Sequence, residues 1–323
     1  LFMTSEDLRF ATNYFVAKYR AERLACDTLV EVGCSIGAQT IEFAKTCKKV
    51  IALEIDKRKA QYAEMNMAKN GIKNVEVICA DALEVDIKKA DVVFCDTERA
   101  PEEKQRTLEA LKPSVKELIK KYSKLTKEIC IEIPPQTKEI KLDCEKEYVS
   151  IGGELNRLNL YFGKLKSADS SVVTLPEFAR VEGSPEETQL ARTDAKNYLY
   201  EIDEAVTKAR LVDAMAGLLD KEATEFKDDC RFLTSDDKIE SPFFKNTFKV
   251  MALLKGKNEA AEELHRLKYG KVVLRQNVDP KRYWLERKSY ENNLRGNKIA
   301  HLIVTPWSYL ICERLSSPVP EIS

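Results

Sequence analysis

The sequence predicts an α/β fold built on a mainly parallel sheet, followed by a smaller α+β domain. In the first half of the chain, short continuous apolar runs alternate with amphipathic stretches, which is typical of parallel strands buried on both faces by helices. After about residue 165 the composition changes, first to a polar stretch and then to a segment rich in Gly, Pro and Glu. The length of 323 residues exceeds what one ordinary core requires, so two domains are expected.

The first domain is expected to open with a helix. Apolar residues recur at roughly helical spacing from Ser5, a suitable N-cap, to Leu24. Five strands then alternate with helices, the fifth being stopped by Pro134-Pro135, and a hairpin through Gly152-Gly153 adds two strands at the sheet edge. The expected strands are 28–32, 50–54, 75–79, 91–95, 128–133, 147–151 and 157–162, and the expected helices are 38–45, 57–70 and about 102–122.

The second domain is expected to follow a linker. Residues 181–193 are the best linker candidate, and a helix over 202–219 comes next. Asp279-Pro280 indicates a helix start, because proline is favoured in the first turn. The β-α-β-α-β-β order that results suits a small α+β domain of ferredoxin-like type. Its expected strands are 247–254, 271–278, 299–305 and 308–314, and its expected helices are 257–267 and 280–292.

These elements divide the chain into four expected parts. They are an N-terminal helix at 1–24, the α/β domain at 25–165, a linker with extra strands at 166–200, and the α+β domain at 201–323. The net charge is zero, but residues 241–315 hold 15 Lys and Arg against 7 Asp and Glu, a net of +8. A basic module is therefore expected on an acidic one, although a solvated lysine-rich surface explains the same counts.

Other features of the composition exclude some classes of protein. No apolar run approaches the roughly 18 residues that span a bilayer, and no secretory signal opens the sequence, so no membrane and a cytoplasmic location are expected. The nine cysteines include no CxxC pair, and the only histidines, His265 and His301, lie far apart. No metal site is expected from this pattern. We expect His265 on a helix surface and His301 on a strand.

A glycine turn and two acidic residues carry the chemistry of the first domain. The turn, Glu31-Val-Gly33-Cys-Ser-Ile-Gly37, lies between a strand and a helix, where glycine lets the backbone approach a ligand closely. Glu54 ends the second strand, where a carboxylate can accept hydrogen bonds from two ribose hydroxyls. Asp81 follows the third strand, where a carboxylate can accept a hydrogen bond from an adenine amino group. Carboxyl ends of parallel strands meet at one sheet edge, so one adenosyl site is expected.

This constellation resembles the class I S-adenosylmethionine-dependent methyltransferases. The resemblance implies a seven-stranded, Rossmann-like sheet and S-adenosyl-L-methionine as cofactor, with Ser35 departing from the middle glycine of many members. A nicotinamide enzyme fits less well, because Gly-x-Gly-x-x-Gly is absent, and no GK[ST] follows for a P-loop. The residues that the resemblance assigns to the cofactor are Glu31, Gly33, Cys34, Ser35, Gly37, Glu54, Ile55, Asp81, Ala82 and Asp96.

The acceptor is expected at the end of the fourth strand, in Cys95-Asp96-Thr-Glu-Arg99. Methyl transfer is an in-line displacement from a sulfonium, so positioning of the nucleophile supplies much of the rate. Asp96 is the candidate to orient or deprotonate the acceptor, and Arg99 the candidate to hold its phosphate or carboxylate. The alternative is that Asp96 caps a following helix and Arg99 pairs with an acid. Pro134-Pro135-Gln136 after the fifth strand is expected to shape one pocket wall.

Nearly the whole chain from 25 to 315 also resembles a narrower family, the methyltransferases with a C-terminal THUMP-like domain. Tyr200–Val206, Phe232–Asp236, Ser241–Phe248 and Val272–Pro280 carry this resemblance. It implies RNA binding, which suits the basic composition. Tyr283 and Trp284 are candidates for stacking on bases, with core packing the expectation for Trp284. The phosphate-contact candidates are Lys245, Lys249, Arg275, Lys281, Arg282, Arg287, Lys288, Arg295 and Lys298.

The sequence thus favours an RNA methyltransferase, acting on tRNA or rRNA, with a Rossmann-like catalytic domain and a basic RNA-docking module. Two alternatives remain open. One is a small-molecule or protein methyltransferase whose C-terminal domain only covers the site. The other is a cofactor-binding interaction module without activity. The acceptor atom is left open as well.

Overall fold

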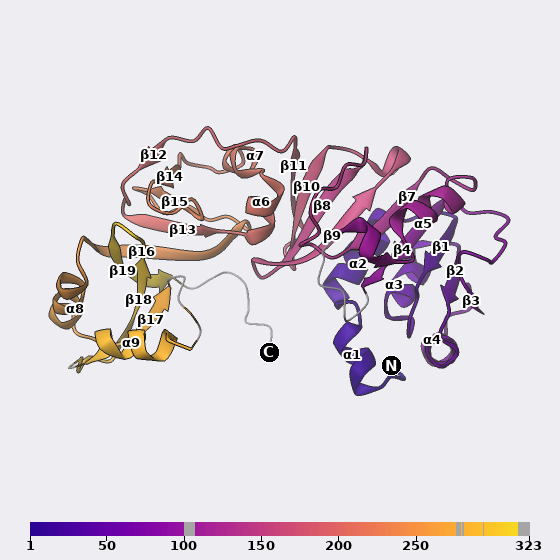
Figure 1. The fold of residues 1–323 in the computed structure, drawn as a ribbon, viewed down its shortest axis with the longest axis horizontal. Helices are drawn as coiled ribbons and strands as arrows, with labels where there is room; N and C mark the ends of the chain where they lie inside the picture. The colour runs from indigo at the N-terminus through magenta and orange to yellow at the C-terminus, as the bar shows by residue number, and fades with distance from the viewer. Residues whose placement is uncertain (100–106, 276–278, 280, 293, 316–323) are drawn as a thin grey trace. The chain divides into compact units, whose positions relative to one another are not determined.

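The computed structural model describes residues 1–99, 107–275, 279, 281–292 and 294–315 (Figure 1). The chain forms two compact units. The first comprises Leu1–Ile151 with Leu155–Pro185, and the second comprises Gly152–Glu154 with Glu186–Ser323. The division after Pro185 falls inside the segment expected to be a linker. Within the described ranges, no helix is long and apolar enough to cross a membrane.

Two helices replace the single N-terminal helix that was expected, so that prediction was wrong. They are α1 (Ser5–Phe10) and α2 (Tyr14–Arg23). Thr4, rather than Ser5, caps α1 in a reciprocal capping box with Asp7. Ala11 leaves the helical conformation, and the side chain of Asn13 then accepts a hydrogen bond from the backbone N–H of Phe15 to cap α2.

The first unit is organised around nine strands rather than the seven that the resemblance implied. Five of them form the expected parallel array, β3-β2-β1-β4-β7, and β9 pairs antiparallel with β7. The additional strands β10 and β11 come from the expected linker. β10 pairs in parallel with β8 and antiparallel with β11, and its apolar residues Val172, Val173 and Leu175 are buried. The strands are β1 (Thr28–Val32), β2 (Lys49–Glu54), β3 (Val75–Cys79), β4 (Val92–Asp96), β7 (Ile129–Ile133), β8 (Glu145–Ile151), β9 (Glu154–Tyr161), β10 (Ser170–Leu175) and β11 (Ala179–Gly183).

Helices α3 (Ala38–Thr46) and α4 (Lys57–Lys69) confirm the expected helices of the first domain. The long helix expected over about 102–122 is much shorter. Residues 100–106 lie outside the described part, Leu108–Ala110 is a 3-10 turn, β5 (Glu98–Arg99) pairs with β6 (Leu111–Lys112), and α5 is Val115–Tyr122. Pro113 disfavours helix in the residue before it, and Ser114 starts α5 with a capping box to Glu117.

Eight strands form the sheet of the second unit, in the order β12-β14-β15-β13-β16-β19-β18-β17. The predicted β-α-β-α-β-β order is confirmed as β16-α8-β17-α9-β18-β19. This differs from the β-α-β-β-α-β order of a ferredoxin-like fold. The elements are β12 (Arg192–Thr193), β13 (Tyr198–Ile202), β14 (Thr224–Phe226), β15 (Phe232–Ser235), β16 (Phe244–Leu254), α8 (Lys257–Arg266), β17 (Tyr269–Arg275), α9 (Tyr283–Glu291), β18 (Lys298–Val304) and β19 (Tyr309–Leu315).

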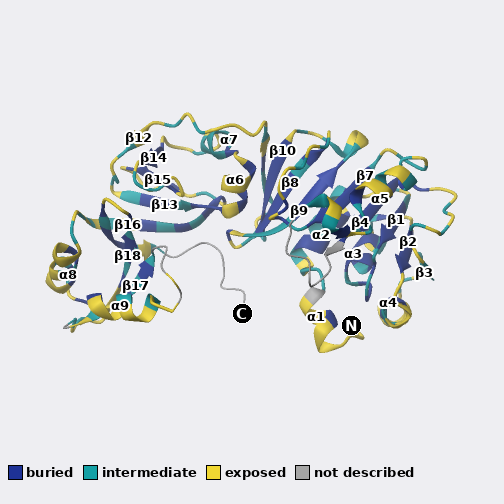
Figure 2. Ribbon diagram, viewed as in Figure 1, coloured by how far each residue is buried: buried dark blue, intermediate teal, exposed yellow. Residues whose placement is uncertain are grey.

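The helix expected at 202–219 is two short ones, α6 (Glu204–Ala209) and α7 (Val212–Ala216). Arg210 between them adopts a positive φ of 58°, which ends α6. Each unit buries its own apolar core, with dark strands inside and exposed outer helix faces in Figure 2. In the second unit, α8 and α9 contribute Leu264 and Tyr290 to a cluster with Leu302 of β18.

Candidate functional site

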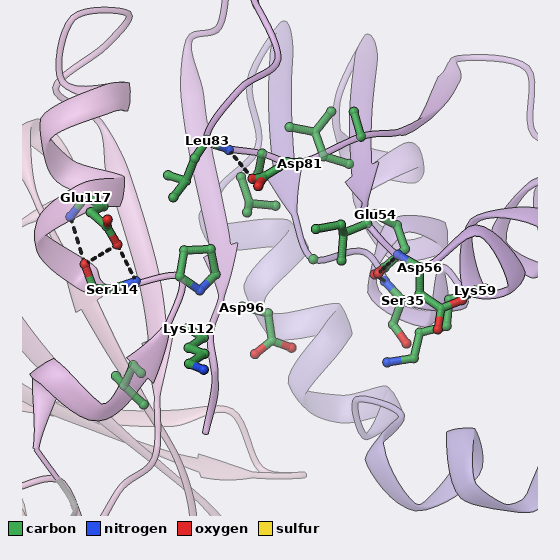
Figure 3. Close-up of a pocket in the computed structure, with 18 of the residues that line it drawn as sticks. Ser35, Glu54, Asp56, Lys59, Asp81, Leu83, Asp96, Lys112, Ser114 and Glu117 are labelled. Atoms are coloured by element: carbon green, nitrogen blue, oxygen red, sulfur yellow. Dashed lines mark hydrogen bonds between the residues drawn. The ribbon is translucent and has the colours of Figure 1, made fainter. Parts of the chain in front are cut away.

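A cavity of about 840 Å³ opens in the first unit at the carboxyl ends of β1, β2 and β4 (Figure 3). Its volume is in the range of pockets that enclose small molecules and cofactors. Figure 3 shows Ser35 and Glu54 on one side, Ser114 and Glu117 on the other, and Asp96 between them. The lining residues are Val32, Gly33, Ser35, Leu53, Glu54, Ile55, Asp56, Lys59, Ala80, Asp81, Ala82, Leu83, Asp96, Glu109, Leu111, Lys112, Pro113, Ser114 and Glu117.

The glycine turn after β1 has three residues with positive φ. Gly33 has a φ of 80° and Gly37 a φ of 82°, whereas Ser35, the residue that departs from the methyltransferase pattern, has a φ of 50°. A Cβ on Gly33 would lie 3.0 Å from the carbonyl oxygen of Asp96. Both glycines are therefore favoured by backbone conformation, and at Gly33 the backbone of Asp96 also leaves little space for a side chain. Ser35 holds a conformation that is strained for an L-residue.

Glu54 ties the end of β2 to this turn. One carboxylate oxygen accepts the backbone N–H of Ser35 at 2.8 Å, and the other accepts that of Asp56 at 2.9 Å. Asp56 in turn caps α4 by accepting from the N–H groups of Arg58 and Lys59. Each oxygen of the Glu54 carboxylate therefore accepts one backbone hydrogen bond, and these two bonds fix the side chain in the pocket wall.

Asp81 follows β3 at the far side of the same pocket. One of its carboxylate oxygens accepts the backbone N–H of Leu83 at 2.8 Å, and Asp81 itself is exposed. The next residue, Ala82, accepts a hydrogen bond from the hydroxyl of Tyr122 through its carbonyl at 2.8 Å. This contact attaches the Asp81 turn to α5, so the turn is held in place by a helix distant in sequence.

Of the ten residues assigned to the cofactor, seven line the pocket: Gly33, Ser35, Glu54, Ile55, Asp81, Ala82 and Asp96. Glu31, Cys34 and Gly37 are not among its lining residues. Glu31 is almost completely buried, and burial raises its pKa to about 7. Its Oε2 has no hydrogen-bond partner among the described residues, which is uncommon for a buried polar atom.

Asn66 on α4 is a residue that sequence reasoning missed. It is fully buried, and its side-chain N–H group donates to the carbonyl of Ile36 in the glycine turn at 2.8 Å and to that of Phe2 at 3.0 Å. A Cβ on Gly37 would lie 2.8 Å from Cε of Met67 beside it, so the flexible end of that side chain would have to move. The only signal in the sequence was an asparagine inside a helix, a residue type that competes with helical hydrogen bonding.

Asp96 ends β4 and lines the pocket, as expected of an acceptor-site residue. The alternative that it caps a following helix is wrong, because the chain continues into β5. Thr97, which is buried, donates from its hydroxyl to the carbonyl of Glu132 in β7 at 2.7 Å and so anchors the end of β4. Arg99 ends β5, and its side chain lies outside the described part of the chain.

One pocket wall was not expected from the sequence. It comes from Glu109 to Glu117, a segment assigned to the middle of a long helix. Leu111 and Pro113 give this wall an apolar surface, and Lys112 and Ser114 give it polar groups. The run Pro113-Ser114 with Glu117 three residues later is a capping-box pattern, so the signal for a helix start was present. Pro134-Pro135-Gln136 does not line the pocket.

Some basic candidates of the second unit form ion pairs and some are exposed, and Arg282 and Lys298 are both paired and exposed. Lys245 pairs with Glu154 and Glu204, and Arg275 pairs with Glu201 at 3.0 Å. Arg287 pairs with Glu291 and Lys298 with Glu313, while Arg282 lies 3.8 Å from Glu286. Paired cations attract phosphate less strongly than exposed ones. The exposed candidates are Lys249, Lys281, Arg282, Lys288, Arg295 and Lys298.

Three predictions about aromatic or histidine side chains have clear outcomes. Core packing of Trp284 was the wrong expectation, because its side chain is 62% exposed. Tyr283 and Tyr290, seven residues apart, occupy the face of α9 that packs on the core, and this leaves Trp284 outside. His265 is exposed on α8 and His301 lies on β18, as expected. Burial, together with Arg275 and Arg314, lowers the pKa of His301 to about 4.

Comparison with known proteins adds three findings. Residues 26–174 match a family model described as a methyltransferase domain. A probable ribosomal RNA small subunit methyltransferase A of Methanococcus maripaludis is 45% identical over 69 residues, which are 21% of this chain and 25% of that protein. A ribosomal RNA small subunit methyltransferase A of Wigglesworthia glossinidia brevipalpis is 33% identical over 87 residues, 27% of this chain and 30% of that protein. The chain thus spans between a quarter and a third of the length of these relatives.

A solved structure resembles the chain over nearly its full length. It is that of a "putative methyltransferase" from Porphyromonas gingivalis W83, with a TM-score of 0.75 and 16% identity, over 96% of this chain and 82% of that one. The similarity shows that the two chains share a fold. The matched family model lies almost entirely within the first unit, which is therefore similar to a methyltransferase domain of α/β type.

Proposed function

We propose that this chain, with a methyltransferase domain over residues 26–174, is an S-adenosylmethionine-dependent methyltransferase that acts on RNA. The observation that carries the proposal is one pocket lined by the glycine turn, Glu54 and Asp81. Each comes from the carboxyl end of a different strand, where α/β sheets bind their ligands.

The side chains in this pocket fit the cofactor. A carboxylate has about four acceptor sites, and Glu54 uses two of them for the N–H groups of Ser35 and Asp56. Its remaining lone pairs suit the ribose hydroxyls. Asp81 uses one oxygen for Leu83 and keeps the other for the adenine amine. The turn at Gly33 to Gly37 borders the methionine end, and the cofactor supplies an electrophilic sulfonium methyl group.

The residues at the carboxyl end of β4 position the acceptor. Asp96 orients the acceptor and takes the proton that it loses as its new bond to carbon forms. Thr97, hydrogen bonded to Glu132, keeps the backbone that carries Asp96 in register with β7. Arg99 is the proposed group for a phosphate of the acceptor.

RNA is the proposed acceptor class, for two independent reasons. Two curated relatives that the chain matches in part are named as ribosomal RNA methyltransferases. The second reason is the net charge of +8 over residues 241–315, which favours binding to a phosphate backbone. We propose that this C-terminal module is the THUMP-like, RNA-docking part of the protein.

The proposal is tested by calorimetry and by transfer of a labelled methyl group. We expect S-adenosylhomocysteine to bind the full chain, and an Asp81→Ala substitution to weaken that binding roughly tenfold, through loss of a hydrogen bond to charge. With labelled S-adenosylmethionine, total tRNA or rRNA should become labelled, whereas pools of small molecules or proteins should not. Affinity for RNA should fall steeply as salt rises.

An Asp96→Asn substitution isolates the acceptor step. We expect turnover to fall roughly a hundredfold or more, with little change in S-adenosylhomocysteine affinity. Asp86→Asn is the matched control, because Asp86 is exposed and pairs only with Lys88 among the contacts described. Labelling of small molecules or proteins in place of RNA would reject the RNA acceptor. Cofactor binding without transfer of the labelled methyl group to any pool would reject the proposed methyltransferase activity.

A further inference from the structure

The chain has two tryptophans, and both are exposed on the second unit. Trp284 in α9 is 62% exposed, and Trp307 in the turn between β18 and β19 is 68% exposed. Tryptophan is highly buried on average, but a single exposed apolar residue is ordinary, so the surroundings of each indole decide whether it marks a contact surface.

Around Trp284, the side chains form what we call the α9 face: Lys281, Trp284, Leu285 and Lys288, all exposed. Trp284 and Lys288 are one helical turn apart and therefore neighbours on the helix surface. The opposite side of α9, with Tyr283 and Tyr290, packs on the core. The α9 face is thus an apolar centre with cations at its ends.

Both acidic side chains of α9 are engaged in ion pairs, and Glu286 also lies 3.8 Å from Arg282 at the start of the helix. Glu291 accepts from the backbone N–H of Val272 at 2.8 Å and pairs with Arg287 at 2.9 Å, while Glu286 pairs with Lys257 at 3.1 Å. The guanidinium of Arg287, held in this way, lies 5.3 Å from the ring centre of Trp284. This cation–π contact with Arg287 orients the indole of Trp284.

We infer that the α9 face stacks an unpaired base of single-stranded RNA on Trp284, while Lys281 and Lys288 contact the flanking phosphates. This inference rests on the proposed RNA acceptor and names where the RNA is held. Single strands present base faces that aromatic side chains can stack on, whereas a duplex keeps its bases stacked internally. Two exposed lysines, three residues before and four residues after the indole, favour a polyanion over an apolar protein partner.

Trp307 provides a matched control within the same unit. It is equally exposed, but Ser308 next to it donates to the acidic Asp228, and Trp307 is not on the basic helix. The Trp307→Ala variant leaves Trp284 as the only tryptophan, and the Trp284→Ala variant leaves Trp307. Since each side chain is mostly exposed, both variants should fold, and each reports the emission of one indole.

The experiment titrates the full-length variants with a mixed-sequence RNA oligonucleotide of about 12 nucleotides, single-stranded or annealed to its complement. We expect the single strand to quench Trp284 saturably in Trp307→Ala, with an affinity that falls as salt rises. The same RNA should leave the emission of Trp307 unchanged in Trp284→Ala, and should bind that variant roughly tenfold or more weakly. The duplex should quench Trp284 much less.

Three outcomes would overturn the inference. They are unchanged Trp284 emission at saturating RNA, native RNA affinity in Trp284→Ala, and Trp284 emission that follows protein concentration instead of RNA, which would indicate self-association. Labelled methyl transfer to RNA, measured on the same variants, separates this failure from that of the proposed function. If Trp284→Ala still binds and methylates RNA like the native chain, only the α9 face is rejected. If no variant binds RNA, the acceptor class is rejected too.

Discussion

The side-chain N–H group of Asn66 donates to the carbonyl oxygen of Ile36 at 2.8 Å, and so connects the middle of α4 to the glycine turn. Asn66 is fully buried and reaches the carbonyl of Phe2 as well. The turn that borders the proposed methionine site is therefore held by an interaction that neither the strand before it nor the helix after it supplies.

Replacement of Asn66 by Ala should loosen the turn without touching the adenosine site. We expect S-adenosylhomocysteine to bind roughly tenfold more weakly, because an unsatisfied buried carbonyl costs about 1–3 kcal/mol. Binding of 5′-methylthioadenosine, which lacks the amino-acid part, should change much less. Calorimetry with both ligands measures the difference between the two losses of affinity. Asn74→Ala is the control, since Asn74 also bridges two carbonyls, those of Ala44 and Cys47. Equal losses for both ligands would contradict the role assigned to Asn66.

Gly37→Ala should destabilise the fold more than Gly71→Ala does. Both glycines have positive φ, so each substitution carries a backbone cost of about 1–2 kcal/mol. Only at Gly37 would the new Cβ also meet a neighbour, Met67 Cε at 2.8 Å, whereas Gly71 has no atom within 4 Å. Because Met67 Cε is the end of a flexible side chain, the additional loss should be about 0.5–1.5 kcal/mol, the cost of a displaced rotamer, measured by urea unfolding. Indistinguishable unfolding midpoints for the two variants would mean that Met67 of α4 moves aside at no measurable cost, and would contradict the prediction.

Glu54→Gln should weaken cofactor binding roughly tenfold or more, because an amide leaves one of two backbone donors facing an NH₂ group. The affected donors are the N–H groups of Ser35 and Asp56. Calorimetry with S-adenosylhomocysteine checks this, and Glu76→Gln serves as control, since Glu76 makes an exposed pair with Lys49. Wild-type affinity in Glu54→Gln would remove Glu54 from the site.

Glu31 should make the stability of the first unit fall as pH rises. Burial raises its pKa from an ordinary 4.5 to about 7, with Arg20 opposing and Glu54 adding to the shift. The folded state then holds a proton that the unfolded state releases, so stability is greatest at acid pH and declines between about 4.5 and 7. The full effect is on the order of 3 kcal/mol.

The measurement compares the native chain with Glu31→Gln by urea unfolding from pH 5 to 8. We expect the native chain to lose stability relative to the variant as pH rises. His301 acts in the opposite sense, because its lowered pKa of about 4 makes stability rise with pH. It is present in both proteins and cancels in the comparison. A pH-independent difference would mean that Glu31 ionises normally in the fold.

The sequence by itself determined the local order of elements and much of the pocket. Glu54 and Asp81 could be assigned because each follows a continuous apolar strand, and carboxyl ends of parallel strands must meet at one edge. The same periodicity located α8, β17, β18 and β19 in the second unit. These features depend on neighbouring residues, so a local pattern is enough to encode them.

Only the tertiary structure decided which distant segments meet. It brought the wall from Glu109 to Glu117 to the pocket, set Asn66 against Ile36, added β10 to the sheet and turned Trp284 outward. Each outcome depends on packing between parts of the chain that are far apart in sequence, and hydrophobic burial, which drives that packing, is non-directional. The methyltransferase turn could therefore be predicted from its own residues, whereas the contacts that hold it could not.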